Sequence, residues 1–154
     1  MNETIFKDFP ELRVVDTREI GSDRKIKSYV LRTAGLKKRE ARAIETYWPR
    51  YGLSFKEEML DYSVLFGNDN PVVIEIGFGN GAATAHIAKM RSEYNYIGLE
   101  VFLTGIAKLL NAVGKEGLDN IKMMRFDAVE VLKHMIADAS IAGFHIFFPD
   151  PWPK

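Results

Sequence analysis

The chain has 154 residues, of which 47% are hydrophobic and 27% are charged, with as many basic as acidic side chains. This length fits one globular domain, and no apolar run approaches the roughly 18 residues of a membrane-spanning helix. Cysteine is absent, which excludes disulfides and cysteine metal sites. We therefore expect a cytoplasmic protein without a secretory signal or a membrane partner.

Charge is unevenly distributed along the first third of the chain. Residues 1–23 carry three basic and six acidic side chains and have no sustained hydrophobic period, so we expect them to be largely disordered. Residues 24–42 carry eight basic side chains and one acidic side chain, a net charge of +7. Such a stretch is a candidate for phosphate contacts, although a solvated basic tail has the same composition. We predict a flexible basic extension over residues 1–35 and one domain over residues 36–154.

Two helices are predicted between this extension and the first strand. Residues 37–47 have apolar side chains at spacings of three, and we expect Pro49 and Gly52 to end this helix. Residues 55–66 predict a second helix or a pair of turns, and residues 67–71 have the composition of a loop.

Predicted strands and helices alternate from residue 72 onward. The expected strands are residues 72–76, 94–99, 121–126 and 144–148, and the expected helices are residues 82–90, 102–113 and 128–137. This order predicts an α/β fold with a doubly wound parallel sheet. The strand at residues 144–148 would form an apolar edge of a four-stranded sheet.

A glycine turn connects the first of these strands to a helix in the sequence PVVIEIGFGNG, residues 71–81. The glycines Gly77, Gly79 and Gly81 allow the backbone to adopt positive φ and to approach a ligand closely. A buried strand, a glycine turn and a helix N-terminus together are typical of a nucleotide-type binding site. The spacing Gly77-x-Gly79-x-x-Ala82 also satisfies the fingerprint of a dinucleotide site, so the turn alone does not identify the ligand.

Three carboxylates lie at the ends of predicted strands. Glu75 lies at the carboxyl end of the first strand, where open parallel sheets bind ligands. Glu100 ends the second strand, roughly 20 residues beyond the glycines, where a carboxylate binds both ribose hydroxyls. Asp127 follows the third strand and either contacts the base amine of the same ligand or caps the next helix. The set indicates a cofactor that contains a nucleoside.

The fourth predicted strand runs into the sequence FPDPWPK, residues 148–154. Three prolines stiffen this loop, which carries Asp150, Trp152 and Lys154. Such a loop suits a flat base that stacks on the aromatic ring and donates a hydrogen bond to the carboxylate. The three histidines of the chain share no metal-ligand spacing, and we predict no metal site.

These motifs resemble those of bacterial tRNA (guanine-N7-)-methyltransferases. The matching sequences are PDPWPK, EIGFGNG and GLEV, together with RKIKSYVLR and ETYWPRYGL upstream. The resemblance covers residues 24–154. It implies a Rossmann-like class I methyltransferase that uses S-adenosyl-L-methionine to methylate a guanine in the tRNA variable loop.

The resemblance also implies roles for individual residues. Asp150 matches a proposed active-site residue, and Lys154 matches a substrate contact, beside which we expect Trp152 to bind substrate. Guanine N7 has a free lone pair, so we expect Asp150 to orient the guanine rather than to act as a general base. The expected cofactor-binding residues are Glu75, Gly77, Gly79, Gly81, Glu100, Asp127 and Asp150.

Members of this family continue beyond the PDPWPK motif with a basic stretch and further strands. We therefore expect residues 36–154 to be the cofactor-binding part of a methyltransferase domain whose C-terminal strands are missing. This part alone is expected to be inactive towards tRNA and to be a monomer or a weak homo-oligomer. A nicotinamide-dependent Rossmann oxidoreductase and a non-catalytic RNA-binding module are the alternatives.

Overall fold

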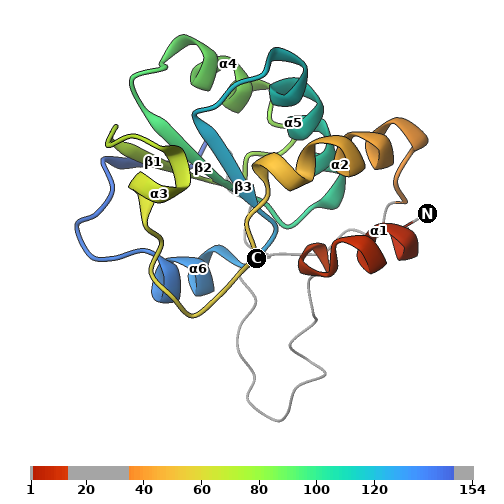
Figure 1. Ribbon diagram of the computed structural model, residues 1–154, viewed down its shortest axis with the longest axis horizontal. Helices are drawn as coiled ribbons and strands as arrows, with labels where there is room; N and C mark the ends of the chain where they lie inside the picture. The colour runs from red at the N-terminus through yellow and green to blue at the C-terminus, as the bar shows by residue number, and fades with distance from the viewer. Residues whose placement is uncertain (1, 14–34, 148–154) are drawn as a thin grey trace, which may run out of the picture.

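The structure, a computed structural model, describes residues 2–13 and 35–147 (Figure 1). The strands are β1 (Val72–Ile76), β2 (Asn95–Leu99), β3 (Ile121–Met124) and β4 (Gly143–His145). The helices are α1 (Asn2–Asp8), α2 (Lys38–Tyr51), α3 (Tyr62–Phe66), α4 (Ala82–Met90), α5 (Leu103–Glu116) and α6 (Ala128–Met135), with a short 3-10 helix η1 (Pro10–Leu12). Across these two ranges, no helix has the length and apolarity needed to cross a membrane.

The four strands form one parallel sheet in the order β3-β2-β1-β4, which confirms the predicted doubly wound fold. Ile74 of the central strand β1 is paired with Ile97 of β2 on one side and with Phe144 of β4 on the other. The chain runs outward from β1 through β2 to β3 and then returns to the opposite side of β1. Ligands of open α/β sheets bind beyond the carboxyl ends of the strands at such a reversal.

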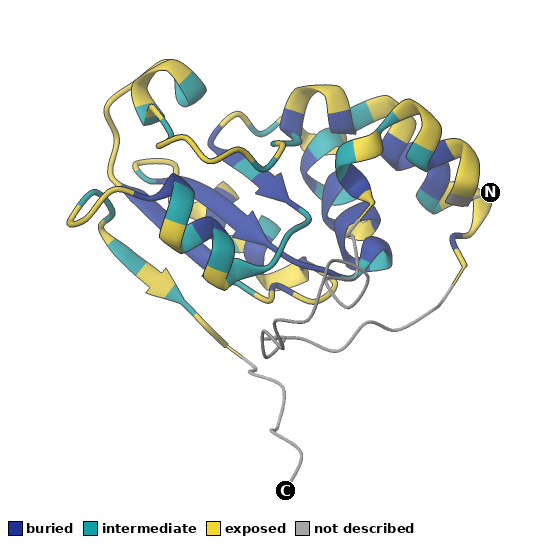
Figure 2. Cartoon of the chain, turned by 90° about the horizontal axis from the view of Figure 1, so that it is seen from below, coloured by how far each residue is buried: buried dark blue, intermediate teal, exposed yellow. Residues whose placement is uncertain are grey.

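Helices cover both faces of the sheet. Val73 packs in a cluster with α1, α2, α4 and α5, whereas Val72 and Ile74 pack in a second cluster with α3 and α6. Successive side chains of a strand point to opposite faces, so a strand covered on both faces is apolar throughout. Figure 2 shows the central strands as a continuous buried layer between the helices.

Helix α2 is longer than the sequence predicts. Pro49 and Gly52 were expected to end the helix. Pro49 lies inside it, because the helix continues to Tyr51, whereas Gly52 directly follows its last residue as predicted. A proline near the end of a helix removes few backbone hydrogen bonds. The last turn is stabilised instead by the buried rings of Trp48 and Tyr51, and the Tyr51 hydroxyl donates to the carbonyl oxygen of Leu118 at 2.6 Å.

Between α2 and β1, the prediction of a second helix or turns over residues 55–66 is correct only in part. Residues 53–61 have no regular structure, and the five-residue helix α3 follows them. Asp61 caps α3, since its side chain accepts a hydrogen bond from the Val64 N–H at 3.2 Å. The apolar residues of this region pack on the α6 face of the sheet.

The N-terminal segment, residues 2–13, is helical and packs on the core, so the prediction of disorder over residues 1–23 is wrong for these residues. Ile5 and Leu12 are 1% and 0% exposed and belong to the same cluster as α2 and α5. Burial of their side chains offsets the entropy of ordering so short a segment. The rest of the predicted extension, residues 14–34, lies outside the described residues.

The two edges of the sheet differ. Gly52 forms a bridge with Met123 of β3, and the Leu53 N–H donates to the Met123 carbonyl oxygen at 2.8 Å. The outer edge of β3 is therefore partly covered by the chain that follows α2. Strand β4 is the other edge, as predicted, and Phe144 and Phe147 are 50% and 45% exposed.

The docking of the N-terminal segment can be tested at Glu11, whose Oε1 accepts a hydrogen bond of 2.7 Å from Trp48 Nε1. Glu11→Ala leaves the indole N–H of buried Trp48 without this acceptor, which is expected to lower the free energy of unfolding by about 1–3 kcal/mol. Urea unfolding measures the change. Glu3→Ala is the matched control, because Glu3 belongs to the same segment but forms only an exposed pair with Arg13. Equal losses in both variants would show that the Glu11–Trp48 contact does not hold the segment.

Candidate functional site

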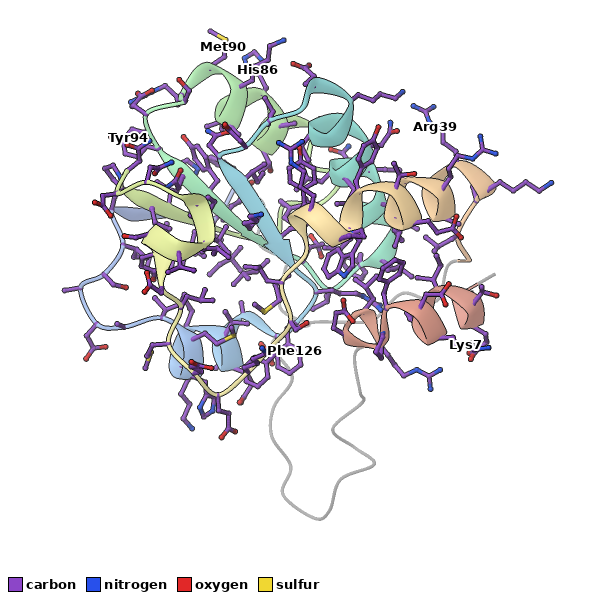
Figure 3. The ribbon with its side chains drawn as sticks, viewed as in Figure 1. Lys7, Arg39, His86, Met90, Tyr94 and Phe126 are labelled. Atoms are coloured by element: carbon purple, nitrogen blue, oxygen red, sulfur yellow. The ribbon has the colours of Figure 1, made fainter. Side chains whose placement is uncertain are left out.

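The candidate site lies at the carboxyl ends of β1, β2 and β3. In Figure 3, Tyr94, which precedes β2, and Phe126, which follows β3, mark the two ends of the sheet. Residues 77–81, which we call the glycine loop, connect β1 to α4 at the same end as Phe126. Glu75, Glu100 and Asp127 also lie at this end, so the fold brings together the three carboxylates predicted from the sequence.

The glycine loop requires glycine at three alternate positions. Gly77, Gly79 and Gly81 have φ values of 69°, 61° and 75°, in the left-handed region that other residues rarely adopt. Gly81 is also tightly packed, since a Cβ there would lie 2.7 Å from the Cβ of Leu109 on α5. The loop is therefore shaped by backbone conformation and seated against α5.

Gly105, in the first turn of α5, is a site residue that the sequence analysis missed. A Cβ at this position would lie 2.1 Å from the carbonyl oxygen of Gly79 and 3.4 Å from Cγ of Glu100. The missing side chain therefore allows the glycine loop to lie directly against the helix. The sequence contains no local signal for this contact, because residues 79 and 105 belong to different elements.

Glu75 is a buried carboxylate beneath the glycine loop, with only 3% of its surface exposed. Burial raises the pKa of its carboxyl above the ordinary value, the Thr84 hydroxyl lowers it, and the negative charge of Glu100 raises it further. Thr84 Oγ1 on α4 is itself buried, and it has no hydrogen-bond partner of standard geometry among the described residues. No lysine or arginine of the described chain forms an ion pair with Glu75.

The raised pKa of Glu75 predicts a specific dependence of stability on pH. The folded state holds the proton more tightly than the unfolded state, so ionisation destabilises the fold as the pH rises from about 4.5 through the folded-state pKa. Glu75→Gln removes this effect. The free energy of unfolding of Glu75→Gln relative to the unchanged chain is therefore expected to rise between pH 4.5 and neutral pH, as measured by urea unfolding. The exposed Glu45→Gln is the control, and a relative stability of Glu75→Gln that stays level with pH would contradict the prediction.

Glu100 organises the backbone around the loop. Its Oε2 accepts a hydrogen bond from the Gly79 N–H at 2.8 Å, and its Oε1 accepts from the N–H groups of Val101 at 2.9 Å and Phe102 at 3.2 Å. With 5% exposure, the carboxylate is buried and its charge is stabilised by backbone dipoles. Glu100 therefore links the end of β2 to the glycine loop.

Asp127 is the N-cap of α6, one of the two roles that the sequence left open. Its Oδ1 accepts a hydrogen bond from the Val129 N–H at 3.0 Å. A carboxylate has lone pairs beyond the one used in capping, so a ligand contact is compatible with this role. The preceding ring of Phe126 stacks on Phe55, with centroids 4.1 Å apart and planes within 5° of parallel, which fixes the start of the loop.

The remaining predicted site residues, Asp150, Trp152 and Lys154, lie outside the described residues. The three histidines lie on different elements: His86 is exposed on α4 (Figure 3), His134 pairs with Glu130 on α6, and His145 on β4 is paired in register with Glu75 of β1. In the described ranges, no group of three or more His, Cys, Asp or Glu side chains is arranged to hold a metal ion.

Comparison with known proteins shows which family the chain resembles. The profile of a family described as putative methyltransferase matches residues 69–154, more than half of the chain. A tRNA (guanine-N(7)-)-methyltransferase of Hydrogenovibrio crunogenus is 45% identical over 131 residues, 85% of this chain and 55% of that protein. Those of Vibrio parahaemolyticus (44%, covering 91% of this chain and 60% of the relative) and Escherichia coli (47%, covering 85% and 55%) are similar.

The chain belongs to the family described as putative methyltransferase. It spans between half and three fifths of the length of the curated relatives that it matches. The methyltransferase profile covers the glycine loop, Glu75, Glu100, Asp127 and Gly105. These residues, which the fold places at the carboxyl ends of the strands, thus all lie in the part of the chain that the family profile matches.

Proposed function

We propose that the protein transfers a methyl group from S-adenosylmethionine to N7 of a guanine in tRNA. The observation that carries the proposal is the pair of buried carboxylates, Glu75 and Glu100, that flank the glycine loop of a methyltransferase-family chain. Its named relatives are tRNA (guanine-N(7)-)-methyltransferases, and the activity of the whole protein is inferred from them together with this site.

The chemistry of the donor set fits S-adenosylmethionine, which carries a positive sulfonium, an ammonium group and ribose hydroxyls. Glu75 is buried without a cationic partner in the described chain, and a ligand cation would supply the missing charge. Glu100 is positioned to accept hydrogen bonds from ribose hydroxyls, and Asp127 from the adenine amine. The buried Thr84 hydroxyl lies beside Glu75 and lowers the pKa of its carboxyl, so it favours the charged form that would bind a cation.

The same geometry disfavours a dinucleotide. A pyrophosphate needs free N–H groups at the glycine loop and at the N-terminus of α4. Here the Gly79 N–H donates to Glu100 at 2.8 Å, and the Ala82 N–H donates to Asn80 Oδ1 at 3.0 Å. Two nearby buried carboxylates would also repel the phosphate charges. The geometry therefore favours S-adenosylmethionine over a nicotinamide dinucleotide.

Methyl transfer to guanine N7 requires little chemistry from the protein's own side chains. Bound S-adenosylmethionine supplies a methyl group on a positively charged sulfur. Guanine N7 has a free lone pair, so no side chain has to remove a proton, and the rate would come from holding the two reactants in line. In this proposal Asp150 orients the guanine by accepting from its amino edge, while Trp152 and Lys154 hold the base and a neighbouring phosphate.

The test uses unmodified tRNA, methyl-labelled S-adenosylmethionine and the protein at its natural length, which intact-mass measurement establishes. Label is expected at a guanine that becomes sensitive to cleavage chemistry specific for N7-methylguanine. Asp150→Ala is the matched variant. It is expected to lose methyl transfer and to keep most of its affinity for S-adenosylmethionine, because Glu75, Glu100 and Asp127 still bind the cofactor even though Asp150 was also expected to contact it. Label on another base or on the protein would overturn the proposal, and binding of tRNA without any binding of S-adenosylmethionine would favour a non-catalytic RNA-binding module.

Part of the proposed tRNA surface lies on α2. Its first turns carry Lys38, Arg39 and Arg42, all exposed, and Figure 3 shows Arg39 pointing away from the sheet. Basic residues at a helix N-terminus oppose the helix dipole, so binding a polyanion would relieve an unfavourable arrangement.

Arg39→Gln tests this surface. It is expected to reduce the slope of log affinity for tRNA against log salt concentration by about one. The reason is that a variant with one phosphate contact fewer releases fewer counterions when it binds tRNA. The matched control is Lys115→Gln, an exposed lysine in the last turn of α5, where no change of slope is expected. Filter binding at several salt concentrations measures both. Identical slopes for Arg39→Gln and the unchanged protein would show that Arg39 does not contact a tRNA phosphate and that this face of α2 is only solvated.

A further inference from the structure

Arg125 connects the N-terminal segment to the carboxyl end of β2. Its Nε donates a hydrogen bond of 2.6 Å to the carbonyl oxygen of Val101, and its Nη1 donates to the carbonyl oxygen of Leu12. Its guanidinium also lies over the ring of Phe6, with Cζ 5.9 Å from the ring centroid. One side chain thus contacts both the last turn of the N-terminal segment and the loop that follows β2.

The peptide groups that Arg125 touches adjoin the candidate cofactor carboxylates. Val101 directly follows Glu100, and its N–H donates to Glu100 Oε1 at 2.9 Å while its carbonyl oxygen accepts from Arg125. Arg125 itself lies two residues before Asp127, in the loop that leaves β3. A displacement of Arg125 would therefore move the backbone that orients Glu100 and the loop that carries Asp127.

The N-terminal segment has its own anchors, which do not involve Arg125. Ile5 and Leu12 are buried in the core, and Glu11 accepts the hydrogen bond from Trp48. The segment is thus expected to stay docked when the arginine is changed. What is lost is the connection between the segment and the site.

We propose that Arg125 is a positioning residue through which the docked N-terminal segment holds Glu100 and Asp127 in the geometry that binds the cofactor. This inference rests on the proposed function, because the positioned site is the S-adenosylmethionine site. It assigns to residues 2–13 a part in cofactor binding, although none of them is among the residues predicted to touch the ligand. Two sites that interact through such a contact must influence each other reciprocally.

Cofactor affinity, measured by calorimetry with S-adenosylmethionine on the 154-residue chain, tests one direction of this coupling. Arg125→Ala is expected to weaken binding by about 5- to 20-fold. Arg125→Lys is expected to recover part of the loss, because its ammonium still donates to one of the two carbonyl oxygens. Arg13→Ala is the matched control, because Arg13 lies over the same Phe6 ring at 5.4 Å but pairs with exposed Glu3. The affinity of this variant for S-adenosylmethionine is expected to stay unchanged.

Hydrogen exchange tests the other direction and separates positioning from a purely structural role. S-adenosylmethionine is expected to slow amide exchange in residues 2–13 of the unchanged chain and not in Arg125→Ala. A residue that only stabilised the fold would change exchange with and without the cofactor alike.

The outcomes separate this inference from the proposed function. Failure of the unchanged chain to bind S-adenosylmethionine would overturn both. Binding that is unchanged in Arg125→Ala, or slowed exchange of residues 2–13 that persists in that variant, would overturn the role of Arg125 alone. If Arg125→Ala does not fold, Arg125→Lys decides: an intermediate affinity supports the coupling, and an unchanged affinity overturns it.

Discussion

Gly105→Ala is expected to lower the affinity for S-adenosylmethionine by about 1–3 kcal/mol, or roughly 5- to 150-fold. The added methyl group would lie 2.1 Å from the carbonyl oxygen of Gly79, well inside contact distance. Neither partner can move easily. Helix α5 is fixed by its buried face, and Gly79 is held by its left-handed conformation and its hydrogen bond to Glu100. The glycine loop would therefore have to shift, and Glu100 would lose its alignment.

Gly114→Ala is the matched control for this prediction. Gly114 lies on the same helix, but a Cβ there would meet the ring of Tyr47, at 2.4 Å, rather than backbone. This variant is expected to change the free energy of unfolding through the contact between α2 and α5, and to bind the cofactor within about twofold of the unchanged chain. Calorimetry and urea unfolding on both variants make the comparison. Equal losses of affinity would mean that Gly105 acts only through overall stability.

Glu100→Ala is expected to have two effects. Cofactor affinity should fall by about 1.5–3 kcal/mol, as expected when hydrogen bonds to a charged group are lost. The empty protein should also be less stable, because the N–H groups of Gly79, Val101 and Phe102 lose their acceptor, at a cost of about 1–3 kcal/mol for each group that remains buried.

Two comparisons make the Glu100 prediction specific. Glu45→Ala, an exposed carboxylate on α2, is expected to change neither stability nor affinity appreciably. Asp150→Ala is expected to leave cofactor affinity nearly unchanged while removing methyl transfer in the natural protein. Equal losses of affinity in Glu100→Ala and Asp150→Ala would contradict the separation of cofactor binding from substrate orientation.

The parts of the fold that follow from local pattern were predictable. The apolar run that became β1 is buried on both faces, so its composition alone indicated a central parallel strand. The glycine loop was predictable because its three left-handed residues need glycine. The positions of Glu75 and Glu100 were predictable because strand ends can be located from the sequence, and they are candidate ligand contacts because ligands of parallel sheets bind at those ends.

The errors and omissions arise from contacts between residues distant in the sequence. The N-terminal segment is too short to show a sustained helical period, and only the cluster formed with α2 reveals why Ile5 and Leu12 are apolar. Gly105 and Arg125 belong to a helix and a loop that appear ordinary in isolation. Their importance depends on Gly79 and Leu12, which the fold brings to them. The prediction that Pro49 helps to end α2 was wrong because a helix end is set by burial as well as by backbone chemistry.

The central place of β1 in the sheet also determines how the sheet can be assembled during translation. Strand β1 is synthesised before the other three strands of the described sheet, so each of these emerges next to an edge that already exists. When a nascent chain has reached Met124, it contains β1, β2 and β3, and the bridge between Gly52 and Met123 can already cover the outer edge of β3. The free side of β1 is then fully uncovered, whereas the outer edge of β3 is partly covered, and β4 occupies the free side of β1. Synthesis in this order favours pairing of β4 with β1, which limits the misregistered sheets that a growing chain can form.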